Sequence, residues 1–432
     1  MRAYVPMTEN AFILNFFRLY NTIWKMGLPF LKKNKRLEAE FHKRITCSHL
    51  SRADIWIQAA SAGEAFLAVC ILKRLSPGTP LKVLVTSTTA QGMDILKTGL
   101  TRKTIGPLID INIEWFPFDM PQTVKQAVKA VNPIVMVLLE TEIWPGLLFY
   151  LKENQTKILI INARLSKKSF RHYLKTKFLW KYLAPDRILA TSDQDAGRYG
   201  QVFGTATITT MPNIKFESIE IPSPESADRL EQIKKILPPR LPLTILASVR
   251  RQEEKEILFI LKDIQTAFPN QVVAIFPRHM HRIESWKRNL ASQHLNFHIR
   301  SGIKTPLQGP GIILWDTFGE LKTVYGLASV VFVGGSLKPL GGQNFIEPAM
   351  QGAVTVIGPY HEDFAWANDI FAKGLVIKKN NWKEISKTLV AAILEPVNRP
   401  DRKALAREYI QSNRGGTEQA CNEILKAFDE SV

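Results

Sequence analysis

Cysteine is scarce in this chain: Cys47, Cys70 and Cys421 are the only three among 432 residues, and they lie far apart in the sequence. This content excludes a disulfide framework and is typical of a reducing cytoplasm. The sequence also lacks the ligand spacing of a zinc site, because His279 and His281 have no third ligand near them. We therefore predict no metal site.

A clean membrane-spanning run is missing as well. Residues 11–31 are the most apolar stretch near either end, but polar and charged residues such as Arg18 and Lys25 interrupt them, and no signal-peptide cleavage site follows. Four basic residues occupy the five positions 32–36. Aromatic and apolar residues followed by basic ones are typical of a helix that lies in or dips into an anionic membrane surface. The alternative interpretation is a first helix packed on a domain.

Acidic residues are few relative to basic ones. Lysine and arginine number 57 against 39 for aspartate and glutamate, which gives a net charge of +18. Such a field favours an anionic partner: a phosphorylated ligand, an acidic lipid surface or nucleic acid. A hydrophobic fraction of 45% is that of a globular protein.

Apolar runs of strand character alternate with helical patterns twice along the chain. This alternation predicts an α/β protein with two doubly wound Rossmann-like domains, each a parallel sheet covered by helices on both faces. The predicted strands are 55–60, 83–88, 134–139, 158–162 and 187–191 in the first series, then 243–248, 271–276, 311–315, 330–333 and 353–357 in the second.

The same pattern predicts the division of the chain into domains. Ligands of such sheets bind beyond the carboxyl ends of the strands, so we expect the two domains to face each other across a cleft lined by strand-end loops. The predicted parts are a membrane-associating segment 1–40, a first domain 41–207, a linker 208–224, a second domain 225–400 and a helical tail 401–432.

The loop after the first strand carries a candidate catalytic residue. Glu64 begins a helix, and the small residues Ser61 and Gly63 leave room beside it. Placed there, a carboxylate can act as a general base toward an incoming hydroxyl group. The alternative is a helix-start residue that the helix dipole favours.

The next strand ends also carry charged side chains. Glu140 and Glu142 follow the strand 134–139, where carboxylates are costly unless paired or used. We expect Glu140 to pair with Arg164 from the following strand end, with a part in holding an acceptor as a further role. Asp193 and Asp195 resemble a metal-binding pair, but capping of the helix that they begin explains them better.

A glycine-rich loop at 334–348 dominates the second series. The sequence contains neither the P-loop pattern nor G-x-G-x-x-G. Gly334 and Gly335 with Ser336 and Lys338 nevertheless predict a loop that wraps a charged group, followed by a helix whose amides point at it. Glu347 in that helix suits the hydroxyls of a ribose. The alternative is an ordinary turn between strand and helix.

Basic residues also follow two other strands of the second series. Arg278 follows the strand 271–276 and can grip a phosphate or a sugar carboxylate with two hydrogen bonds, the alternative being a surface ion pair. Arg250 and Arg251 follow the strand 243–248 and add positive charge. The acidic run 253–256 is interpreted as a solvated helix face.

Eight stretches, in this order along the chain, resemble the Kdo transferases, bacterial enzymes that add 3-deoxy-D-manno-octulosonic acid (Kdo) to the lipid A precursor. The likeness runs from about residue 37 to residue 400. The stretches are ASAGE at 60–64, WFPFD at 115–119, ETEIWPG at 140–146, INARLS at 161–166, NIKFE at 213–217, FPRH at 276–279, DTFGEL at 316–321 and FVGGSLKPLGGQNFIEPA at 332–349.

The resemblance implies a glycosyltransferase of the GT-B type, with the acceptor lipid on the first domain and CMP-Kdo on the second. It implies that Glu64 is the general base of an inverting, metal-independent transfer to lipid IVA, and that Arg278, Asn344 and Glu347 belong to the donor side. The donor is the only small molecule required besides the acceptor. The expected location is the cytoplasmic face of the inner membrane, with an anionic membrane surface and no nucleic acid as partner.

Several residues depart from the family pattern. Glutamine stands at Gln58 and Gln343, where the family usually has histidine, and Leu340 stands where arginine is common. Residues 249–254 replace a Thr-His pair followed by a glycine and glutamates. These departures concern donor affinity and specificity more than the type of reaction.

Two other functions remain compatible with the sequence. The first is a GT-B-like enzyme acting on another nucleotide sugar, such as a sugar-nucleotide epimerase. The second is a non-catalytic basic protein that binds nucleic acid or membrane, whose basic residues would gather with aromatics on one face.

Overall fold

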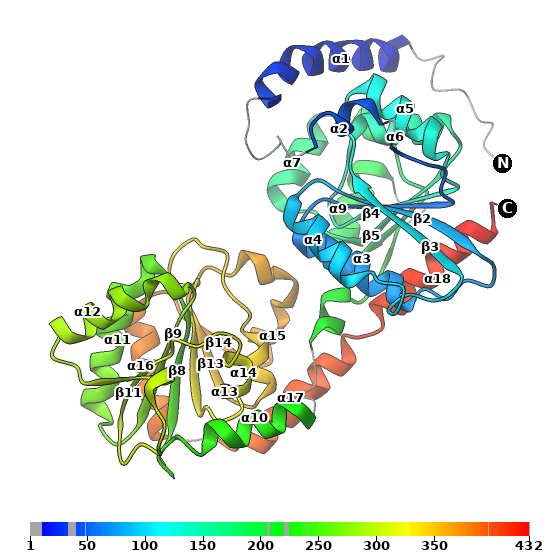
Figure 1. Cartoon of the computed structure of the whole chain (residues 1–432). Helices are drawn as coiled ribbons and strands as arrows, with labels where there is room; N and C mark the ends of the chain where they lie inside the picture. Colours follow the sequence, from blue (N-terminus) through cyan, green and yellow to red (C-terminus); the bar gives the residue numbers. More distant parts are fainter. Residues whose placement is uncertain are drawn as a thin grey trace. The chain divides into compact units, whose positions relative to one another are not determined.

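The computed structural model describes residues 11–32, 40–47, 49–204, 208–219, 224–239, 241–395 and 397–431. The chain forms two compact units, Met1–Ser218 with Asn413–Val432 and Ile219–Ser412. Each unit holds a seven-stranded parallel sheet between helices (Figure 1). The predicted pair of Rossmann-like domains is therefore confirmed.

The sheet of unit 1 has the strand order β3-β2-β1-β4-β5-β6-β7. Its central strands are buried along their whole length because helices cover both faces, which explains their continuous apolar runs. The strands are β1 (Ile55–Ala59), β2 (Leu81–Ser87), β3 (Ile109–Trp115), β4 (Val135–Leu139), β5 (Lys157–Ala163), β6 (Arg187–Ala190) and β7 (Ile208–Thr210).

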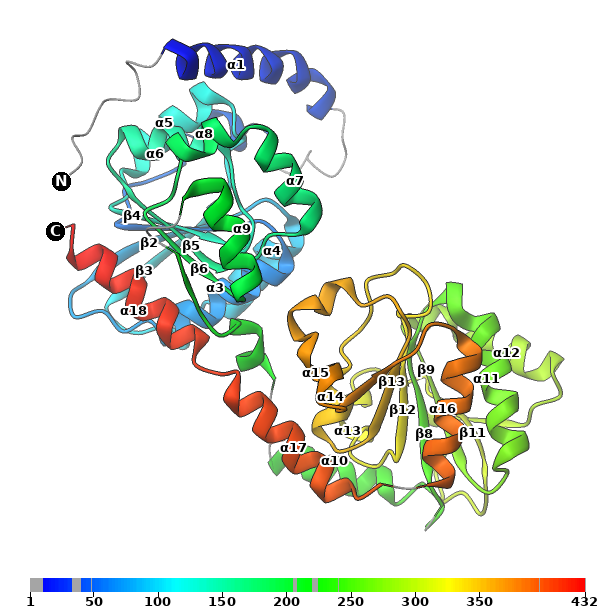
Figure 2. The same cartoon turned by 180° about the vertical axis from the view of Figure 1, so that it is seen from behind.

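Alternate side chains of these strands enter two separate cores. Trp56 and Met136 pack toward α5, α6, α8 and α9, whereas Ile55 and Ile57 pack toward α3, α4 and α18 (Figure 2). The helices of unit 1 are α1 (Ala11–Lys32), α2 (Lys43–Thr46), α3 (Ala62–Arg74), α4 (Ala90–Gly99), α5 (Pro121–Val131), α6 (Pro145–Glu153), α7 (Lys167–Lys175), α8 (Lys177–Tyr182), α9 (Asp193–Phe203), the 3-10 helix η2 (Ile214–Ser218) and α18 (Gly416–Asp429).

Helix α1 packs on unit 1 through one face. Ile13 and Phe17 are buried in the core beside α5 and α6, and the Tyr20 hydroxyl donates a 2.8 Å hydrogen bond to Asp119. Among the described residues, no helix combines the length and the apolar character needed to cross a bilayer. The basic run that the sequence places after this helix lies, except for Lys32, outside the described residues.

Unit 2 repeats the architecture with the strand order β10-β11-β9-β8-β12-β13-β14. Helices α11, α12 and α16 enclose one core with the sheet, and Figure 2 shows α13, α14 and α15 on the other side. The strands are β8 (Leu243–Val249), β9 (Val272–Pro277), β10 (Phe297–Ile299), β11 (Gly311–Leu314), β12 (Val330–Val333), β13 (Val354–Ile357) and β14 (Val376–Lys378).

Many short helical segments connect these strands. The α-helices are α10 (Pro224–Lys234), α11 (Glu254–Ala267), α12 (Ile283–Ser292), α13 (Leu321–Val324), α14 (Ile346–Met350), α15 (Asp369–Ala372), α16 (Trp382–Leu394) and α17 (Arg399–Ser412). The 3-10 helices are η3 (Arg251–Glu253), η4 (Met280–Arg282), η5 (Arg300–Gly302) and η6 (Glu362–Ala367).

The structure divides the expected helical tail 401–432 between the two units. Helix α17 belongs to unit 2, where it packs on α14, and only residues after 412 join unit 1. Helix α18 buries Cys421 and Ile424 against α3. The Arg187 guanidinium on β6 binds Glu423 of this helix and Glu430 directly after it. The last helix is therefore an integral part of the first unit.

This assignment predicts the effect of shortening one buried side chain. Ile424→Ala removes methyl groups from a fully buried position, so the free energy of unfolding should fall by about 2–5 kcal/mol. Asn422→Ala, an exposed neighbour on the same helix, should change it by less than about 0.5 kcal/mol. Urea denaturation measures both, and equal stabilities of the two variants would mean that α18 does not contribute to the core.

Candidate functional site

Glu64 lies in the first turn of α3, directly beyond the carboxyl end of β1. Its carboxylate accepts hydrogen bonds from the Ala60 amide at 2.7 Å and from the Ser61 hydroxyl at 2.9 Å, while the Ser61 hydroxyl accepts from the Glu64 amide at 3.3 Å. Ser61 is the N-cap of α3, and Glu64 accepts from the backbone amide of the residue before this cap. The helix-start role of Glu64 is therefore present, and the same bonds fix the direction of its carboxylate.

The environment of Glu64 shifts its acid–base behaviour. The residue is only 8% exposed, and its pKa is raised to about 7, with burial as the largest cause. The negative charge of Glu142 contributes to this increase, Glu140 contributes less, and the hydrogen bonds from Ala60 and Ser61 oppose it. A carboxyl group with a pKa near neutral exchanges protons readily at physiological pH.

Two cations balance the negative charge of Glu140, which lies near Glu64 and Glu142. The Lys215 ammonium lies 2.6 Å from the Glu140 Oε1 atom and the Arg164 guanidinium 3.8 Å, so the expected pair with Arg164 is present and a closer partner joins it. Lys215 comes from η2, in the stretch NIKFE, and its Nζ atom lies 4.0 Å from a Cβ built on Gly63. The stretch NIKFE is part of the resemblance described above, but the sequence alone indicates no role for its lysine.

Glu142 belongs to a buried polar network instead. Its carboxylate accepts hydrogen bonds from the Trp144 indole at 2.7 Å and the Gln58 amide at 3.4 Å, and burial raises its pKa. The other end of the Gln58 amide accepts from the Thr86 hydroxyl at 2.6 Å, and the Trp56 indole donates to Thr86 at 2.8 Å. Glutamine at position 58 thus links the interior of the sheet to the strand-end carboxylates.

The other unit places Arg278 at the end of β9. Its side chain is exposed. Burial raises the pKa of the nearby Tyr325, the charge of Glu347 raises this pKa as well, and the charge of Arg278 lowers it. The Glu347 carboxylate on α14 lies 3.5 Å from the Lys322 ammonium. The Asn344 side chain accepts from the amides of Ile346 and Glu347 at 3.1 and 3.4 Å, so it caps the short helix that follows the loop.

Two backbone amides of the glycine loop bind a carboxylate of the same unit. The amides of Gly335 and Leu337 donate to the Glu253 carboxylate at 2.6 and 2.8 Å. Glu253 is fully buried and Glu254 is 6% exposed, so the interpretation of residues 253–256 as a solvated helix face is wrong. Their charge is used internally because Glu253 binds the loop and Glu254 binds the Arg282 guanidinium at 2.7 Å.

The remaining loop residues also have internal partners. Gly334 lies against β8, where an added Cβ would come within 2.8 Å of the Ser248 carbonyl oxygen. The Ser336 hydroxyl donates to the Val333 carbonyl at 2.6 Å and accepts from the Gly358 amide at 2.9 Å. Lys338 forms an ion pair with Glu256. The loop is thus held rigidly, and its shape depends on glycine through close backbone packing.

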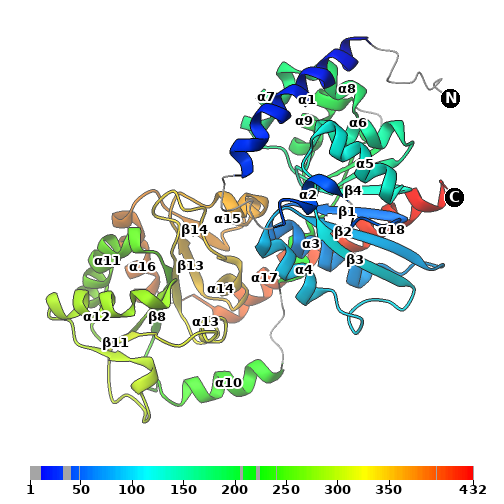
Figure 3. The same ribbon diagram turned by 45° about the horizontal axis from the view of Figure 1, so that its top comes forward.

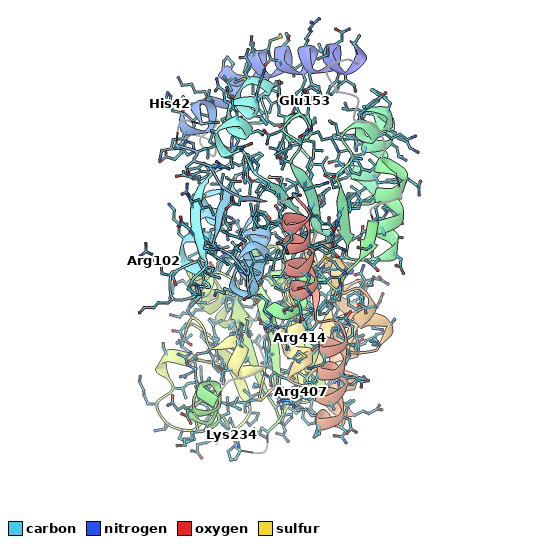
Figure 4. All side chains as sticks on the ribbon, turned by 90° about the vertical axis from the view of Figure 1, so that its right-hand side faces the viewer. His42, Arg102, Glu153, Lys234, Arg407 and Arg414 are labelled. Carbon is cyan, nitrogen blue, oxygen red and sulfur yellow. The ribbon has the colours of Figure 1, made fainter. Side chains whose placement is uncertain are left out.

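Unit 1 has a separate cavity at the opposite ends of its strands. It measures about 850 Å³ and is lined by residues such as Arg52, Lys82 and Ile109. Arg102, on the loop before β3, also lines it and is labelled in Figure 4. Parallel α/β sheets bind ligands at the carboxyl ends of their strands, and this cavity lies at the amino ends. Within the described residues there is no group of three or more acidic, histidine or cysteine side chains that could hold a metal ion.

Known proteins resemble the chain over most of its length. Residues 32–218 match the family model described as 3-deoxy-D-manno-octulosonic-acid transferase (kdotransferase). The chain is 28% identical to the 3-deoxy-D-manno-octulosonic acid transferase of Rickettsia felis over 387 residues, or 87% of this chain and 80% of that protein. It is also 28% identical to the protein of the same name from Bordetella pertussis over 383 residues, or 86% and 87%.

A solved structure shares the fold. The crystal structure of a glycosyltransferase from Rickettsia africae aligns with 88% of this chain and 100% of its own, with a TM-score of 0.55 and 11% identity. At this identity the likeness concerns the architecture of two Rossmann-like units alone.

The raised pKa of Glu64 predicts a pH-dependent change in stability. A carboxyl group whose folded pKa lies above its unfolded value of 4.5 stabilises the fold most when protonated, and this contribution is lost as the pH rises toward 7. Relative to wild type, Glu64→Gln should therefore gain up to about 3 kcal/mol in free energy of unfolding between about pH 4.5 and pH 8. Urea denaturation across this range measures the difference.

The control is Asp94→Asn, which replaces an exposed carboxylate on α4. As a surface substitution, it should keep the free energy of unfolding within about 0.5 kcal/mol of wild type across this range. A Glu64→Gln difference that is equally constant with pH would contradict the raised pKa.

Proposed function

Because the chain resembles Kdo transferases over most of its length, we propose that it belongs to this family of glycosyltransferases and transfers Kdo from CMP-Kdo to lipid IVA, a lipid A precursor, in lipopolysaccharide biosynthesis. The observation that carries this proposal is the buried Glu64 carboxyl group beyond the end of β1, whose pKa is raised to about 7. The resemblance to Kdo transferases supports the type of reaction, and the geometry of this carboxyl group supports its assignment as the base.

Glu64 is the general base of the proposed reaction. The acceptor hydroxyl group attacks the anomeric carbon of Kdo, the bond from that carbon to the phosphate oxygen breaks, and CMP leaves with the bonding electrons. The hydroxyl proton passes to the Glu64 carboxylate. A single displacement of this kind inverts the anomeric centre. A base with a pKa near the working pH combines a useful ionised fraction with adequate basicity.

The other residues of unit 1 support the acceptor side. Ser61 orients the base through its hydrogen bond, and Gly63 leaves space beside it. Glu140 forms ion pairs with Lys215 and Arg164, so its role is to hold these cations in place. Within the described residues, by contrast, Glu64 forms no ion pair, which keeps its carboxylate available for a proton.

The donor side belongs to unit 2 in this proposal. CMP carries a single phosphate group, whose charge basic side chains such as Arg278 can balance without a metal ion. Glu347 accepts hydrogen bonds from the ribose hydroxyls. This role requires its carboxylate to turn from the Lys322 ammonium toward the ribose. Asn344 fixes the start of α14 and hence the direction of Glu347.

We also propose that α1 attaches the protein to the anionic cytoplasmic face of the inner membrane. Leu19, Ile23, Met26 and Phe30 are between 58% and 75% exposed, and their spacing of three and four residues puts them on one face of the helix. That face is distinct from the one buried on unit 1. Figure 3 draws α1 with α7 and α8, so an apolar stripe and a basic surface belong to the same end of unit 1.

The basic surface consists of exposed side chains on α7 and α8. It combines positive charge with Phe178 and Tyr182, which are 43% and 48% exposed. This combination suits an interface with acidic lipid and with a phosphorylated acceptor. Its basic residues are Lys167, Lys168, Arg171, Lys175 and Lys181.

The stripe predicts how membrane binding can be removed without unfolding the protein. Replacing Leu19, Ile23, Met26 and Phe30 together by glutamine should leave the protein in the supernatant after centrifugation with anionic vesicles, with an unchanged melting temperature. The matched control replaces the exposed polar residues Asn15 and Thr22 by glutamine and should sediment with vesicles like wild type. Sedimentation of the stripe variant with the vesicles would refute the attachment.

The second functional prediction concerns the base. Glu64→Gln keeps the size and hydrogen bonding of the side chain but cannot accept the proton, and a general base contributes about 10²–10⁴-fold to a rate. The variant should lose nearly all Kdo transfer while its CMP affinity matches that of wild type. Asp94→Asn, the exposed control, should keep full activity.

Transfer by Glu64→Gln at more than about a tenth of the wild-type rate would rule out Glu64 as the base, because such a loss is below the smallest typical contribution. A capping role alone would lower the thermal stability instead and leave the activity per folded molecule unchanged.

A further inference from the structure

The ends of β8 and β9 are shaped by a bulge. The two strands pair Leu246 with Ile275 but Val249 with Pro277, so β8 contains one residue more than β9 over this interval. Ser248 in the bulge has a φ of +51°, a backbone conformation that non-glycine residues rarely adopt. Bulges turn the following side chains in a new direction.

Two arginines leave the sheet directly beyond this bulge. Arg250 follows Val249, Arg278 follows Pro277, and the Arg278 amide donates to the Val249 carbonyl at 2.9 Å. The two residues therefore begin from adjacent positions at the same edge of the sheet. The pKa of the nearby His279 is lowered by desolvation first, and then by the positive charges of Arg250, His281 and Arg278.

Neither arginine side chain forms an ion pair with a carboxylate of the described residues. Within the described residues, the guanidinium groups of Arg250 and Arg278 form no ion pair, and the buried Nε atom of Arg250 has no hydrogen-bond acceptor. Two other arginines of the same unit differ, since Arg282 and Arg300 each bind a glutamate carboxylate through two nitrogens. An unsatisfied buried donor beside a second cation is costly unless an anion completes the site.

A buried carboxylate fixes the position of Arg250. The Glu253 carboxylate accepts from the Arg250 amide at 3.1 Å and from the Gly335 and Leu337 amides at 2.6 and 2.8 Å. Glu253 has no exposed surface. Three backbone amides from two separate segments thus converge on one carboxylate, which ties the backbone of Arg250 to the glycine loop.

We propose that Arg250 and Arg278 form one binding site for an oxyanion of the donor, and that Glu253 is the positioning residue that holds Arg250 against the glycine loop. The inference rests on the proposed function, because CMP-Kdo supplies two such groups, the phosphate and the sugar carboxylate. Two planar guanidinium groups can each offer paired hydrogen bonds to either oxyanion. The internal bonding of the loop amides leaves this task to the arginine side chains.

The test compares Arg250→Gln with Arg251→Gln. Both variants lose one positive charge, at neighbouring positions, but Arg251 is exposed and forms no part of the proposed site. Arg250→Gln should weaken donor use by about 10- to 150-fold, the range for losing hydrogen bonds to a charged group, and should melt at the wild-type temperature. Arg251→Gln should stay within about threefold of wild type.

Two measurements distinguish the oxyanions. Calorimetric titration with CMP reports the phosphate alone, and the KM for CMP-Kdo in Kdo transfer reports phosphate and carboxylate together. A loss in both assigns Arg250 to the phosphate, and a loss in KM alone assigns it to the carboxylate. Unchanged values in both, or equal losses in Arg251→Gln, would overturn the proposed site. Wild-type protein that bound no CMP and transferred no Kdo would contradict the proposed function itself.

Glu253 has its own readout. Glu253→Gln leaves an amide group facing backbone amides, so hydrogen exchange at Gly335 and Leu337 should accelerate and the KM for CMP-Kdo should rise, while Arg250→Gln leaves this exchange unchanged. A purely structural role of Glu253 would lower the melting temperature and leave the KM of the folded protein unaltered. That result would remove Glu253 from the proposal.

Discussion

A carboxylate taken out of water must receive hydrogen bonds or positive charge, and the described parts of both units depend on carboxylates for which this requirement is met. In unit 1, buried Asp119 accepts from the amides of Gly146 and Leu147 at the start of α6 and from the Tyr20 hydroxyl of α1. In unit 2, Glu253 binds three amides and fixes the glycine loop. Each carboxylate joins segments that are far apart in the sequence.

Glu64 shares a raised pKa with Asp119, because burial raises both values to about 7 despite the hydrogen bonds that each carboxylate accepts. Its two hydrogen bonds orient the side chain, but they do not offset burial and the neighbouring charge of Glu142, so its pKa remains raised to about 7. Glu64 is distinguished by its place, in the first turn of α3 beyond the carboxyl end of β1, where parallel α/β sheets bind their ligands. A carboxyl group with a raised pKa in that place is suited to take a proton during a reaction.

Backbone strain gathers at the same strand ends. Glu140, Asn162 and Ser248 have φ values of +54°, +57° and +51°, and a left-handed conformation costs a non-glycine residue about 1–3 kcal/mol. Local bonds hold two of them in place, since the Glu140 carbonyl accepts from the Tyr199 hydroxyl and the Asn162 side chain accepts from the Ile214 amide. The strain directs side chains at the carboxyl ends of the sheets, where α/β proteins bind their ligands.

The sequence predicts the middle of each sheet well and its margins poorly. Central strands are buried on both faces and give unbroken apolar runs, whereas the four missed strands, β3, β7, β10 and β14, are all sheet edges. An alternating pattern in β3, which reads Ile-Asp-Ile-Asn-Ile-Glu-Trp, is the one signal that reveals such an edge. The position of Glu64 after the first strand also follows from the sequence.

The partners of the charged residues could not be predicted in the same way. Glu253 stands in an acidic run typical of a solvated helix, and only the folding of β12 beside β8 brings the glycine loop to it. Lys215 lies 75 residues from Glu140, and no local pattern announces their contact. Lys215 and Glu140 lie in stretches that resemble the Kdo transferases, but their pairing is a property of the tertiary structure.

Product analysis tests the central claim most directly. Purified protein is incubated with CMP-Kdo and a tetra-acylated lipid A precursor, and the lipid fraction is analysed by mass spectrometry. The account predicts that the lipid gains the mass of at least one Kdo residue and that CMP is released, with neither change when the protein is omitted. Lipid of unchanged mass in the presence of folded protein that binds CMP would contradict it.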